Sequence, residues 1–435
     1  MNRALVLTAA LAAVLAAPAA AALAQQQQSG EPTRTSQQLK RDVLIDADLW
    51  DRRPRMMAAG LGFTQIIGVP GMNANDLAAS EVAVRAAGGA WNRLTCAETP
   101  TLGDYTSAVS PTTVAFGFGF PTTFSSGLPV EFSWPVLPST LDPTDFRVTL
   151  SDGSVVTPEL AALQPNFEYN ERAVPVLFGK FGNRLPASDP ASVYVVRTEV
   201  VADDTPLKLV GPGGRTVSAV GMYATASTSP YGDPDAPASE RTGPRLAAAK
   251  LTRMSTRGEN APAAFRTNLP NDGVALYGDA AKFRLRIFTT GGFSPDGVLG
   301  IKPTEFERYF RLRVRGKNGR TVLVTKANRD YRIAGGRLRV LGLADLGRKQ
   351  DSYDDCYSED RDNQIDIVLD GDARAMRRIT HVDIPGSGRY DPLYNPGGPG
   401  NDPTPGVRYT VGSPAISQPV IQALRDPMTV TYRAR

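Results

Sequence analysis

The sequence predicts a mainly β protein with two antiparallel β-sandwich-like domains and a short helical segment near the N-terminus. Short runs of alternating apolar and polar residues recur from about residue 96 to the C-terminus. Alternation with a period of two residues is typical of a strand with one buried face. Turn-forming Gly, Pro, Asn and Asp residues separate the runs. Little helical periodicity lies between them, which favours stacked antiparallel sheets over an α/β fold.

The first 24 residues have the features of a signal peptide. Arg3 supplies a positive charge, an apolar run follows at 4–17, and the small residues at 22–24 fit a cleavage motif. We therefore expect cleavage before Gln25 and a mature chain that is secreted or periplasmic. Because no later run reaches about 18 apolar residues, we expect no membrane span after cleavage.

The remaining chain of about 410 residues is too long for one ordinary domain. Residues 25–74 are polar or irregular, and 75–223 hold the helical segment and the first sandwich-like domain. Residues 224–276 contain six prolines and are interpreted as a linker. Residues 277–435 form the second sandwich-like domain, with an acidic loop and a loop rich in Gly and Pro.

The first domain is expected to begin with a helix over 75–94, because this segment has helix-forming residues and Asn75 as a possible N-cap. The later runs are expected as strands at 129–136, 145–150, 174–179, 193–201, 207–210 and 216–222. Trp134 and Phe146 lie in these runs and are expected in the core. Within the linker, the spacing of apolar residues at 244–254 predicts a second helical segment.

The second domain shows the cleanest alternation. Strands are expected at 282–290, 309–316, 321–325, 337–343, 364–371 and 378–385, with further strands near 407–411 and 428–435. Between them, 385–406 has 12 Gly or Pro residues out of 22 and is expected as an irregular loop. The rhythm of strands and turns is similar to that of immunoglobulin-like domains, which is an architecture and implies no function.

Arginines alternate with apolar residues on three of these strands. We expect the apolar side chains to face the core and the arginines to form a cationic outer face. In an exported protein such a face suits an anionic polysaccharide or another anionic component of the cell envelope. The alternatives are a solvated face and a surface that pairs with the acidic segment. The arginines are Arg284, Arg286, Arg311, Arg313, Arg315, Arg337 and Arg339.

Residues 351–372 carry nine carboxylates, and like charges this close repel each other unless something offsets them. One interpretation is a calcium site, since Ca²⁺ takes six to eight oxygen ligands. The spacing does not match an EF-hand loop. The other interpretations are pairing with the arginine face and a solvated loop. The candidate ligands are Asp354, Asp355, Glu359, Asp360, Asp362 and Asp366.

Cys96 and Cys356 are the only cysteines. An exported protein can form a disulfide, and this bridge would join the N-terminal region to the second domain. The alternative is two separate buried thiols, because a bridge requires a short Cα separation that a sequence does not show.

Several classes of enzyme are excluded by missing residues. His381 is the only histidine, which excludes zinc enzymes with two or more histidine ligands. The sequence holds no CxxC pair, no P-loop, no GxGxxG before a helix and no GxSxG nucleophile elbow. His381 is interpreted as an ordinary strand residue, and we assign no catalytic residue. The formal net charge of +4 is small for 435 residues, so with export we expect no nucleic-acid partner.

The sequence therefore predicts an exported non-enzymatic β protein that acts as a binding or structural module, with calcium as a candidate ion. One alternative is a secreted carbohydrate-active hydrolase or lyase that uses two of the clustered carboxylates. Another is an extracellular module for protein–protein interaction or adhesion.

Overall fold

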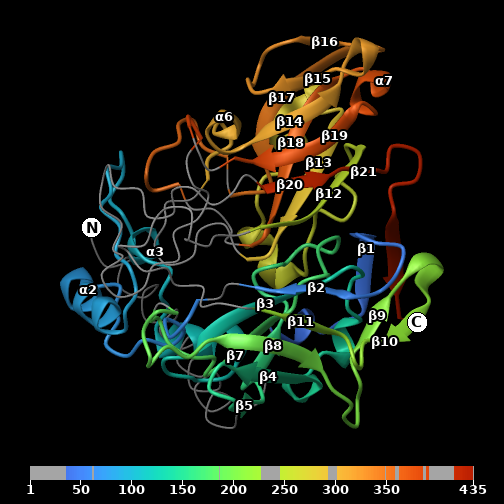
Figure 1. Ribbon diagram of the computed structural model, residues 1–435. Coiled ribbons are helices and arrows are strands. Elements are labelled where there is room, and N and C mark those ends of the chain that lie inside the picture. The colour runs from blue at the N-terminus through green and yellow to red at the C-terminus, as the bar shows by residue number, and fades with distance from the viewer. Residues whose placement is uncertain are drawn as a thin grey trace, which may run out of the picture.

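Strands dominate the architecture of the chain. The computed structural model describes residues 36–60, 63–185, 187–226, 245–291, 301–347, 349–357, 362–385, 388–390 and 416–434. The strands form several sheets, which are antiparallel apart from one pairing between β12 and β21 (Figure 1). The mainly β fold class is confirmed, and the division into two sandwich-like domains stays a prediction.

The C-terminal half, yellow to red in Figure 1, contains a six-stranded and a four-stranded sheet. The six strands, in spatial order, are β16 (Tyr331–Ile333), β17 (Gly336–Ala344), β18 (Gln364–Gly371), β13 (Phe283–Thr289), β12 (Leu246–Arg253) and β21 (Ile421–Gln422). The four are β15 (Thr321–Val324), β14 (Arg311–Arg315), β19 (Ile379–Ile384) and β20 (Ile416–Pro419).

One hydrophobic core joins these two sheets. Leu285 and Ile367 enter it from the six-stranded sheet, and Leu312 and Val382 enter it from the four-stranded sheet. All four side chains are fully buried. The alternation that the sequence shows on β13 and β14 therefore predicted the inward side chains correctly.

The N-terminal region, blue to green, holds two four-stranded sheets and a short hairpin. The first sheet is β2 (Met56–Ala59), β3 (Ser126–Phe132), β7 (Val176–Gly179) and β6 (Leu160–Ala162). The second is β11 (Tyr223–Thr225), β8 (Val195–Val200), β4 (Phe146–Leu150) and β5 (Val155–Val156). The hairpin pairs β9 (Lys208–Val210) with β10 (Thr216–Ser218). Trp134 and Phe146 lie in the core of this region, as expected.

The two ends of the described chain pair with each other. Strand β1 (Val43–Asp48) runs antiparallel to β22 (Thr429–Arg433). Leu44 and Val430 from this pair belong to the same core as Phe146. The last strand of the chain therefore completes the core of the N-terminal region.

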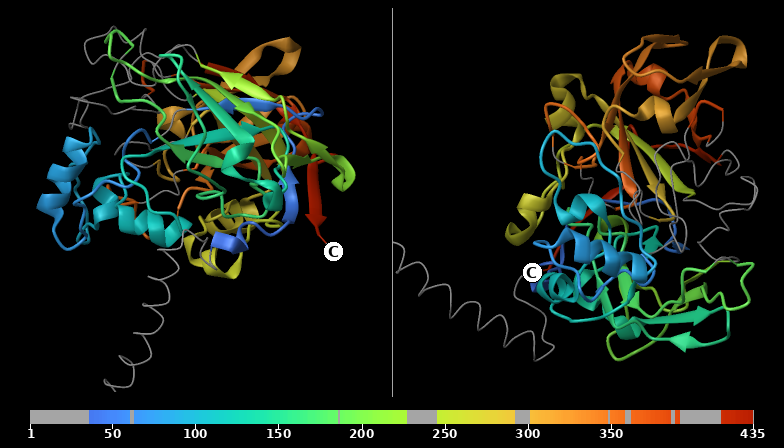
Figure 2. Two further views of the ribbon diagram at one scale, coloured as in Figure 1. Left: turned by 90° about the horizontal axis from the view of Figure 1, so that it is seen from below. Right: turned by 90° about the vertical axis from the view of Figure 1, so that its left-hand side faces the viewer.

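Helices are short, and α2, α3 and α4 lie together beside the N-terminal sheets (Figure 2). The α-helices are α2 (Leu77–Ala86), α3 (Leu102–Tyr105), α4 (Pro111–Phe118), α5 (Gly273–Tyr277), α6 (Phe306–Tyr309) and α7 (Ala373–Met376). The 3-10 turns are η1 (Ser36–Gln38), η2 (Pro138–Thr140), η3 (Pro143–Asp145), η4 (Pro212–Gly214), η6 (Ala263–Asn268), η7 (Gly278–Ala280) and η9 (Lys317–Gly319). No helix within the described ranges is long and apolar enough to cross a membrane.

The helix predicted for 75–94 forms over a shorter range. Its N-cap is Asp76, whose side chain accepts a hydrogen bond from Ala79 N, and not Asn75. The helix ends before Gly88, which has a φ of +79° that a residue with a side chain rarely adopts.

The helical segment predicted for 244–254 is wrong. These residues form β12, which lies between β13 and β21 in the six-stranded sheet. Most of its side chains are buried, so contacts on both faces outweigh the helix-forming composition. The loop predicted at 385–406 and the strand predicted at 407–411 lie almost entirely outside the described residues.

The solvent exposure expected for the arginines of β13 is also wrong, and the acidic Asp366 of the neighbouring β18 is buried with them. Arg284 is 5% exposed, and Arg286 and Asp366 are each 1% exposed. The second face of the six-stranded sheet is covered by β1 and by the segment around Glu171, as the ion pairs below show. Alternation separates the two faces of a strand, but it does not show whether water or protein covers the polar face.

Candidate functional site

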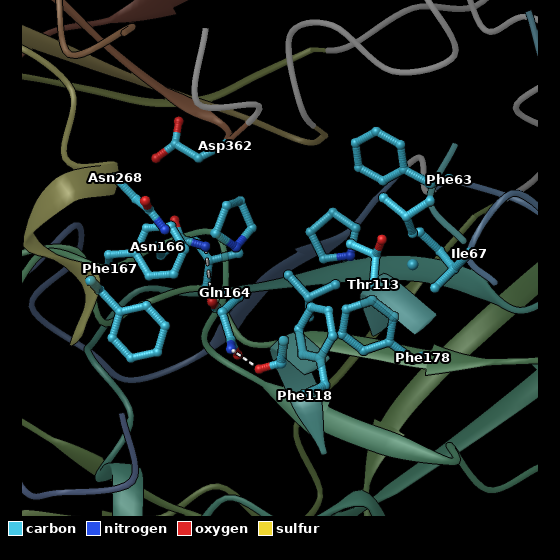
Figure 3. Close-up of a pocket in the computed structure, with 18 of the residues that line it drawn as sticks. Phe63, Ile67, Thr113, Phe118, Gln164, Asn166, Phe167, Phe178, Asn268 and Asp362 are labelled. Atoms are coloured by element: carbon cyan, nitrogen blue, oxygen red, sulfur yellow. Dashed lines mark hydrogen bonds between the residues drawn. The ribbon is translucent and has the colours of Figure 1, made fainter. Parts of the chain in front are cut away.

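A cavity of about 420 Å³ lies where the N-terminal region meets residues of the C-terminal half (Figure 3). Helix α4, strands β3 and β7, the segment at 164–167 and the turn η6 contribute to its wall. Most of the wall is apolar. It includes the phenylalanines Phe63, Phe116, Phe118, Phe167, Phe178 and Phe265.

Helix α4 has clear sequence signals at both ends. Ser110 caps it by accepting a hydrogen bond from Thr113 N, and Pro111 occupies the first helical position. Gly119 ends the helix in the left-handed conformation at a φ of 76°. These signals fix the short helix that presents Phe116 and Phe118 to the cavity.

Strands β3 and β7 leave space where they pair. Gly127 on β3 lies opposite Phe178 on β7, and a side chain at Gly127 would first meet Phe63, Phe178 and Val176 at 3.5–3.8 Å. All three of these residues line the cavity. The missing side chain at Gly127 therefore helps to keep the cavity open.

The cavity has one polar side. In Figure 3, Asp362, Asn268 and Asn166 gather on one side, and Phe63 and Phe178 lie on the other. Asp362 is the one charged residue among the described residues of the wall. Its Oδ1 accepts a hydrogen bond from Gln364 N at 2.8 Å.

Two amides of the cavity wall, Asn363 and Asn166, differ in their partners. Asn363 Nδ2 donates to Glu131 Oε1 at 2.9 Å and to Thr289 O at 3.0 Å. Asn166 Nδ2 donates to Val174 O at 3.3 Å. Its Oδ1 is buried and has no hydrogen-bond partner within the described part of the chain. A buried acceptor without a donor is costly unless a ligand supplies one.

A buried network of charges lies on the polar face of the six-stranded sheet. Arg286 is at its centre and contacts five carboxylates. The distances are 2.6 Å to Glu171, 2.7 Å to Asp345, 2.8 Å to Asp366, 3.3 Å to Asp48 and 3.6 Å to Glu259. Arg284 pairs with Glu259, and Lys250 pairs with Asp48. These residues come from β1, β12, β13, β18 and the segments between strands, so the network joins both halves of the chain.

The network contains more acids than bases. We define it as the carboxyls of Asp48, Glu168, Glu171, Glu259, Asp345 and Asp366 with the cations Arg172, Lys250, Arg284 and Arg286, whose side chains are all nine-tenths or more buried. Six carboxyls therefore face four cations. At least part of this surplus is expected to stay protonated, because an unpaired buried carboxylate is very costly.

The pKa values within the network agree with this surplus. Burial, together with the charge of Glu259, raises the pKa of Glu168 to about 7. Burial raises the pKa of Glu171 well above its usual range, and the charge of Asp362 raises it further. Asp48 behaves differently, because the charges of Lys250 and Arg286 outweigh burial and hold its pKa below the usual value.

The four predicted calcium ligands that the structure describes, Asp354, Asp355, Asp362 and Asp366, do not form one group. Asp354 Oδ2 accepts from Ala97 N at 2.8 Å, and Asp355 Oδ2 accepts from Thr95 N at 3.1 Å. Asp366 belongs to the charge network, and Asp362 lines the cavity. Glu359 and Asp360 lie outside the described residues, so the calcium site stays a prediction.

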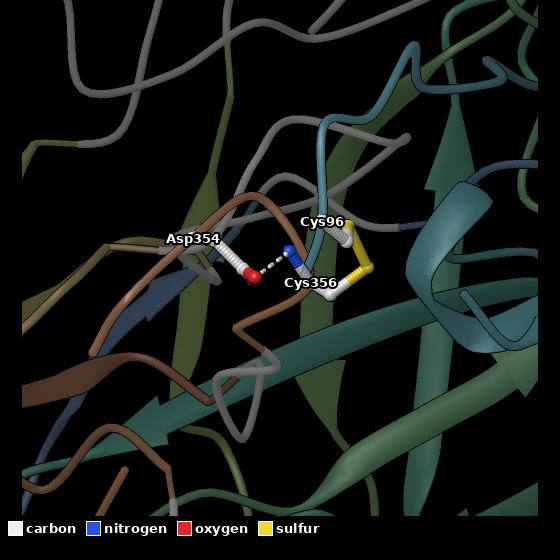
Figure 4. Close-up of side chains that lie close together, drawn as sticks. All are labelled: Cys96, Asp354 and Cys356. Carbon is white, nitrogen blue, oxygen red and sulfur yellow. Dashed lines mark hydrogen bonds between the residues drawn. A yellow bond between two sulfur atoms is a disulfide. The ribbon is translucent and has the colours of Figure 1, made fainter. Parts of the chain in front are cut away.

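The disulfide between Cys96 and Cys356 is confirmed. The two Cα atoms are 5.6 Å apart, and the bridge spans 260 residues of sequence. Asp354 Oδ1 accepts a hydrogen bond from Cys356 N at 2.9 Å (Figure 4). Within the described ranges, Cys96, Asp354 and Cys356 are the one group of His, Cys, Asp or Glu close enough to share a metal. Both sulfurs are in the disulfide, so no thiolate is present to ligate an ion.

The seven predicted arginines are divided among several carboxylates. Arg284 and Arg286 belong to the buried network. Arg311 and Arg313 share Asp383, at 2.7 and 2.9 Å. Arg337 and Arg339 share Asp330, at 3.1 and 2.7 Å. Arg315 is exposed, with no carboxylate partner in the described part of the chain. These seven arginines therefore do not form a continuous cationic face. The binding of an anionic ligand by any of them stays a prediction.

Sequence reasoning missed the cavity. Its residues are spread from Phe63 to Asn363, and no local pattern joins them. One signal was available, the run "AFGFGF" at 115–120, which alternates phenylalanine with glycine at every second position. His381 lies on β19, as predicted, and is not part of the cavity wall.

No protein-family model matches this chain, and no curated protein matches its sequence.

Proposed function

We propose that this chain is an exported, non-enzymatic β protein that binds a small apolar molecule in the aromatic cavity. The cavity itself is the observation that supports the proposal. Its volume of about 420 Å³ lies within the range of roughly 300–1,000 Å³ that is typical of small-molecule sites. Such sites are mainly apolar and hold a few polar groups that orient the ligand, as Asp362 and the asparagines would do here.

The wall of the cavity favours binding over catalysis. A glycosidase needs two carboxyl groups across the bond that it cleaves. Among the described wall residues Asp362 is the one carboxylate, and His381 is not among them. The buried acids of the charge network are paired or enclosed, so they are poorly placed to reach a substrate.

Export is supported by two independent features. The first 24 residues have the composition of a signal peptide, and the disulfide between Cys96 and Cys356 fits an oxidising compartment. In this proposal the sandwich-like halves act as a rigid scaffold. The cavity lies where they meet, which is a common place for a ligand site.

A neutral apolar dye tests the proposal directly. N-phenyl-1-naphthylamine gains fluorescence when it enters an apolar cavity, and we expect saturable binding at one site. Replacing Gly127 with Leu adds a side chain toward Phe63, Phe178 and Val176. We expect this variant to bind the dye about tenfold more weakly, a loss of about 1.4 kcal/mol.

The matched control is Gly103→Leu. Gly103 is exposed, and a side chain there would meet nothing closer than Thr101 Oγ1 at 3.9 Å. We expect this variant to bind the dye as the unchanged protein does. Binding that does not saturate, or that Gly127→Leu leaves unchanged while both variants melt normally, would contradict the proposal.

A further inference from the structure

Phenylalanine is concentrated in the wall of the cavity. Six of the 16 phenylalanines in the chain lie there, and the described wall residues include no leucine and no methionine. A phenylalanine ring is flat and turns about two bonds only, whereas a methionine side chain adapts its shape to many partners. The wall therefore presents flat and rigid surfaces, which suit a flat ligand better than a flexible chain.

Four of the six rings hold each other in place as two pairs. Phe167 and Phe265 stack with ring centroids 4.9 Å apart and planes inclined by 19°. Phe118 and Phe178 pack at 4.7 Å with planes inclined by 55°. In Figure 3, Phe167 lies on one side of the cavity, and Phe118 and Phe178 lie on the other. A ligand between these sides therefore meets a fixed ring on either side.

The cavity reaches the surface of the molecule at Phe116. This residue belongs to the wall, but its side chain is 64% exposed. A side chain added at the neighbouring Gly117, which also lines the cavity, would meet nothing within 4 Å. Exposed apolar surface gains free energy when it is removed from water. A ligand that enters beside α4 would cover part of the Phe116 ring and gain this free energy.

Burial alone does not distinguish an aromatic ligand from a saturated one, because it depends on apolar area. Aromatic rings attract each other further, since the positive edge of one ring contacts the negative face of another. The inclined planes of Phe118 and Phe178 offer both an edge and a face to the cavity. An aromatic ligand gains this attraction, and a saturated ligand of the same shape does not.

We propose that the ligand of the cavity is a flat aromatic compound. Its rings pack against Phe118, Phe167 and Phe178. This inference rests on the proposed function, because the cavity must first admit a small apolar molecule. It adds the chemical class of the ligand, which the volume of the cavity does not determine.

Three alcohols with ten carbon atoms each test the inference. They are 2-naphthol, which is aromatic, decahydro-2-naphthol, which has the same ring skeleton in saturated form, and 1-decanol, which is a flexible chain. The full purified protein is titrated into each alcohol by calorimetry near pH 7. We expect 2-naphthol to bind about fivefold to tenfold more tightly than either saturated alcohol. Burial alone predicts the reverse order, because the saturated alcohols are more hydrophobic.

The variant Phe178→Leu removes one ring and keeps an apolar side chain. We expect the affinity for 2-naphthol to fall about fivefold and the affinity for decahydro-2-naphthol to change less than about twofold. The matched control is Phe310→Leu. Phe310 is fully buried and packs against the ring of Phe306, but it is not part of the cavity wall. This control should leave both affinities unchanged.

The outcomes distinguish the two proposals. If N-phenyl-1-naphthylamine binds but decahydro-2-naphthol binds as tightly as 2-naphthol, the aromatic ligand is overturned and the binding function remains. An equal loss of both affinities in Phe178→Leu, or a dye that binds while none of the alcohols does, would have the same meaning. If neither the dye nor any alcohol binds, both proposals fail. The alcohol series on the unchanged protein decides the question even where Phe178→Leu does not fold.

Discussion

The two faces of strand β13 show two different ways of holding the chain together. On one face Leu285 and Ile287 pack into the apolar core between the two sheets of the C-terminal half. On the other face Arg284 and Arg286 lie among carboxylates from distant segments. Both faces are buried. An apolar contact depends on area and shape, whereas each buried charge depends on partners that must all be present.

The largest expected effect comes from breaking the charged face. Replacing Arg286 with Met removes the cation that contacts five carboxylates and leaves Glu171 and Asp345 without this partner. We expect a loss of about 3–5 kcal/mol in the free energy of unfolding, measured by urea denaturation near pH 7. The loss should shrink as the pH falls toward 5, because the unpaired carboxyls then take up protons. A loss that does not change with pH would contradict this description.

The apolar face gives the matched comparison. Leu285 is fully buried in the core next to Arg286 in sequence. We expect Leu285→Ala to cost about 2–5 kcal/mol through lost burial and a residual cavity. Its cost should be the same at pH 5 and pH 7 in the same urea experiment, because no titratable group loses its partner. A strong pH dependence would mean that the two faces are coupled through the strand.

The charged face also predicts a pH dependence for the unchanged protein. The pKa of Glu168 is about 7 in the folded chain against an ordinary 4.5, chiefly because of burial. Between about pH 4.5 and pH 7 the folded state therefore binds more protons than the unfolded state. Stability is therefore greatest at the acidic end of this window and falls as the pH rises through 7.

The variant Glu168→Gln tests how much Glu168 contributes to the slope of the free energy of unfolding against pH. Glutamine cannot ionise, so the free energy of unfolding should fall less between pH 5 and 8, by on the order of 1–3 kcal/mol. Denaturation curves at several pH values measure the slope. If the slope is unchanged, Glu168 ionises in the folded protein as it does in the unfolded chain.

The smallest effect is expected at the outer arginines. Arg313 pairs with Asp383 at 2.9 Å, and its side chain is 38% exposed. Water screens this pair, and Arg311 also contacts Asp383. We expect Arg313→Met to cost less than about 1 kcal/mol in the urea experiment used for Arg286→Met. If Arg313→Met costs as much stability as Arg286→Met, burial does not determine how much each arginine contributes.

Much of the local structure could be predicted because it depends on near neighbours in the sequence. Alternation placed Leu285, Ile287 and Leu312 in the core correctly, and the composition of the chain identified it as mainly β. The helix start was wrong by one residue, since Asp76 caps it in place of Asn75. The prediction of a helix at 244–254 was wrong, because burial of this segment between two strands overrode its helical spacing.

The candidate sites could not be predicted in the same way. Asp366 was grouped with Asp354 and Asp355 because they are close in sequence, but it pairs with Arg286, 80 residues away. Asp354 and Asp355 instead accept backbone hydrogen bonds from the segment around Cys96. The cavity combines Phe63, Phe178 and Phe265, which share no local pattern.

The sequence by itself determined many of the strands, the inward side chains of β13 and β14, and the two cysteines that can form a bridge. These depend on the alternation of side chains along a strand and on residue chemistry. Only the tertiary structure decided which polar faces are covered by protein and which six phenylalanines enclose one cavity. The physical reason is that burial and pairing depend on distance in space, and the residues concerned are up to 300 positions apart in the chain.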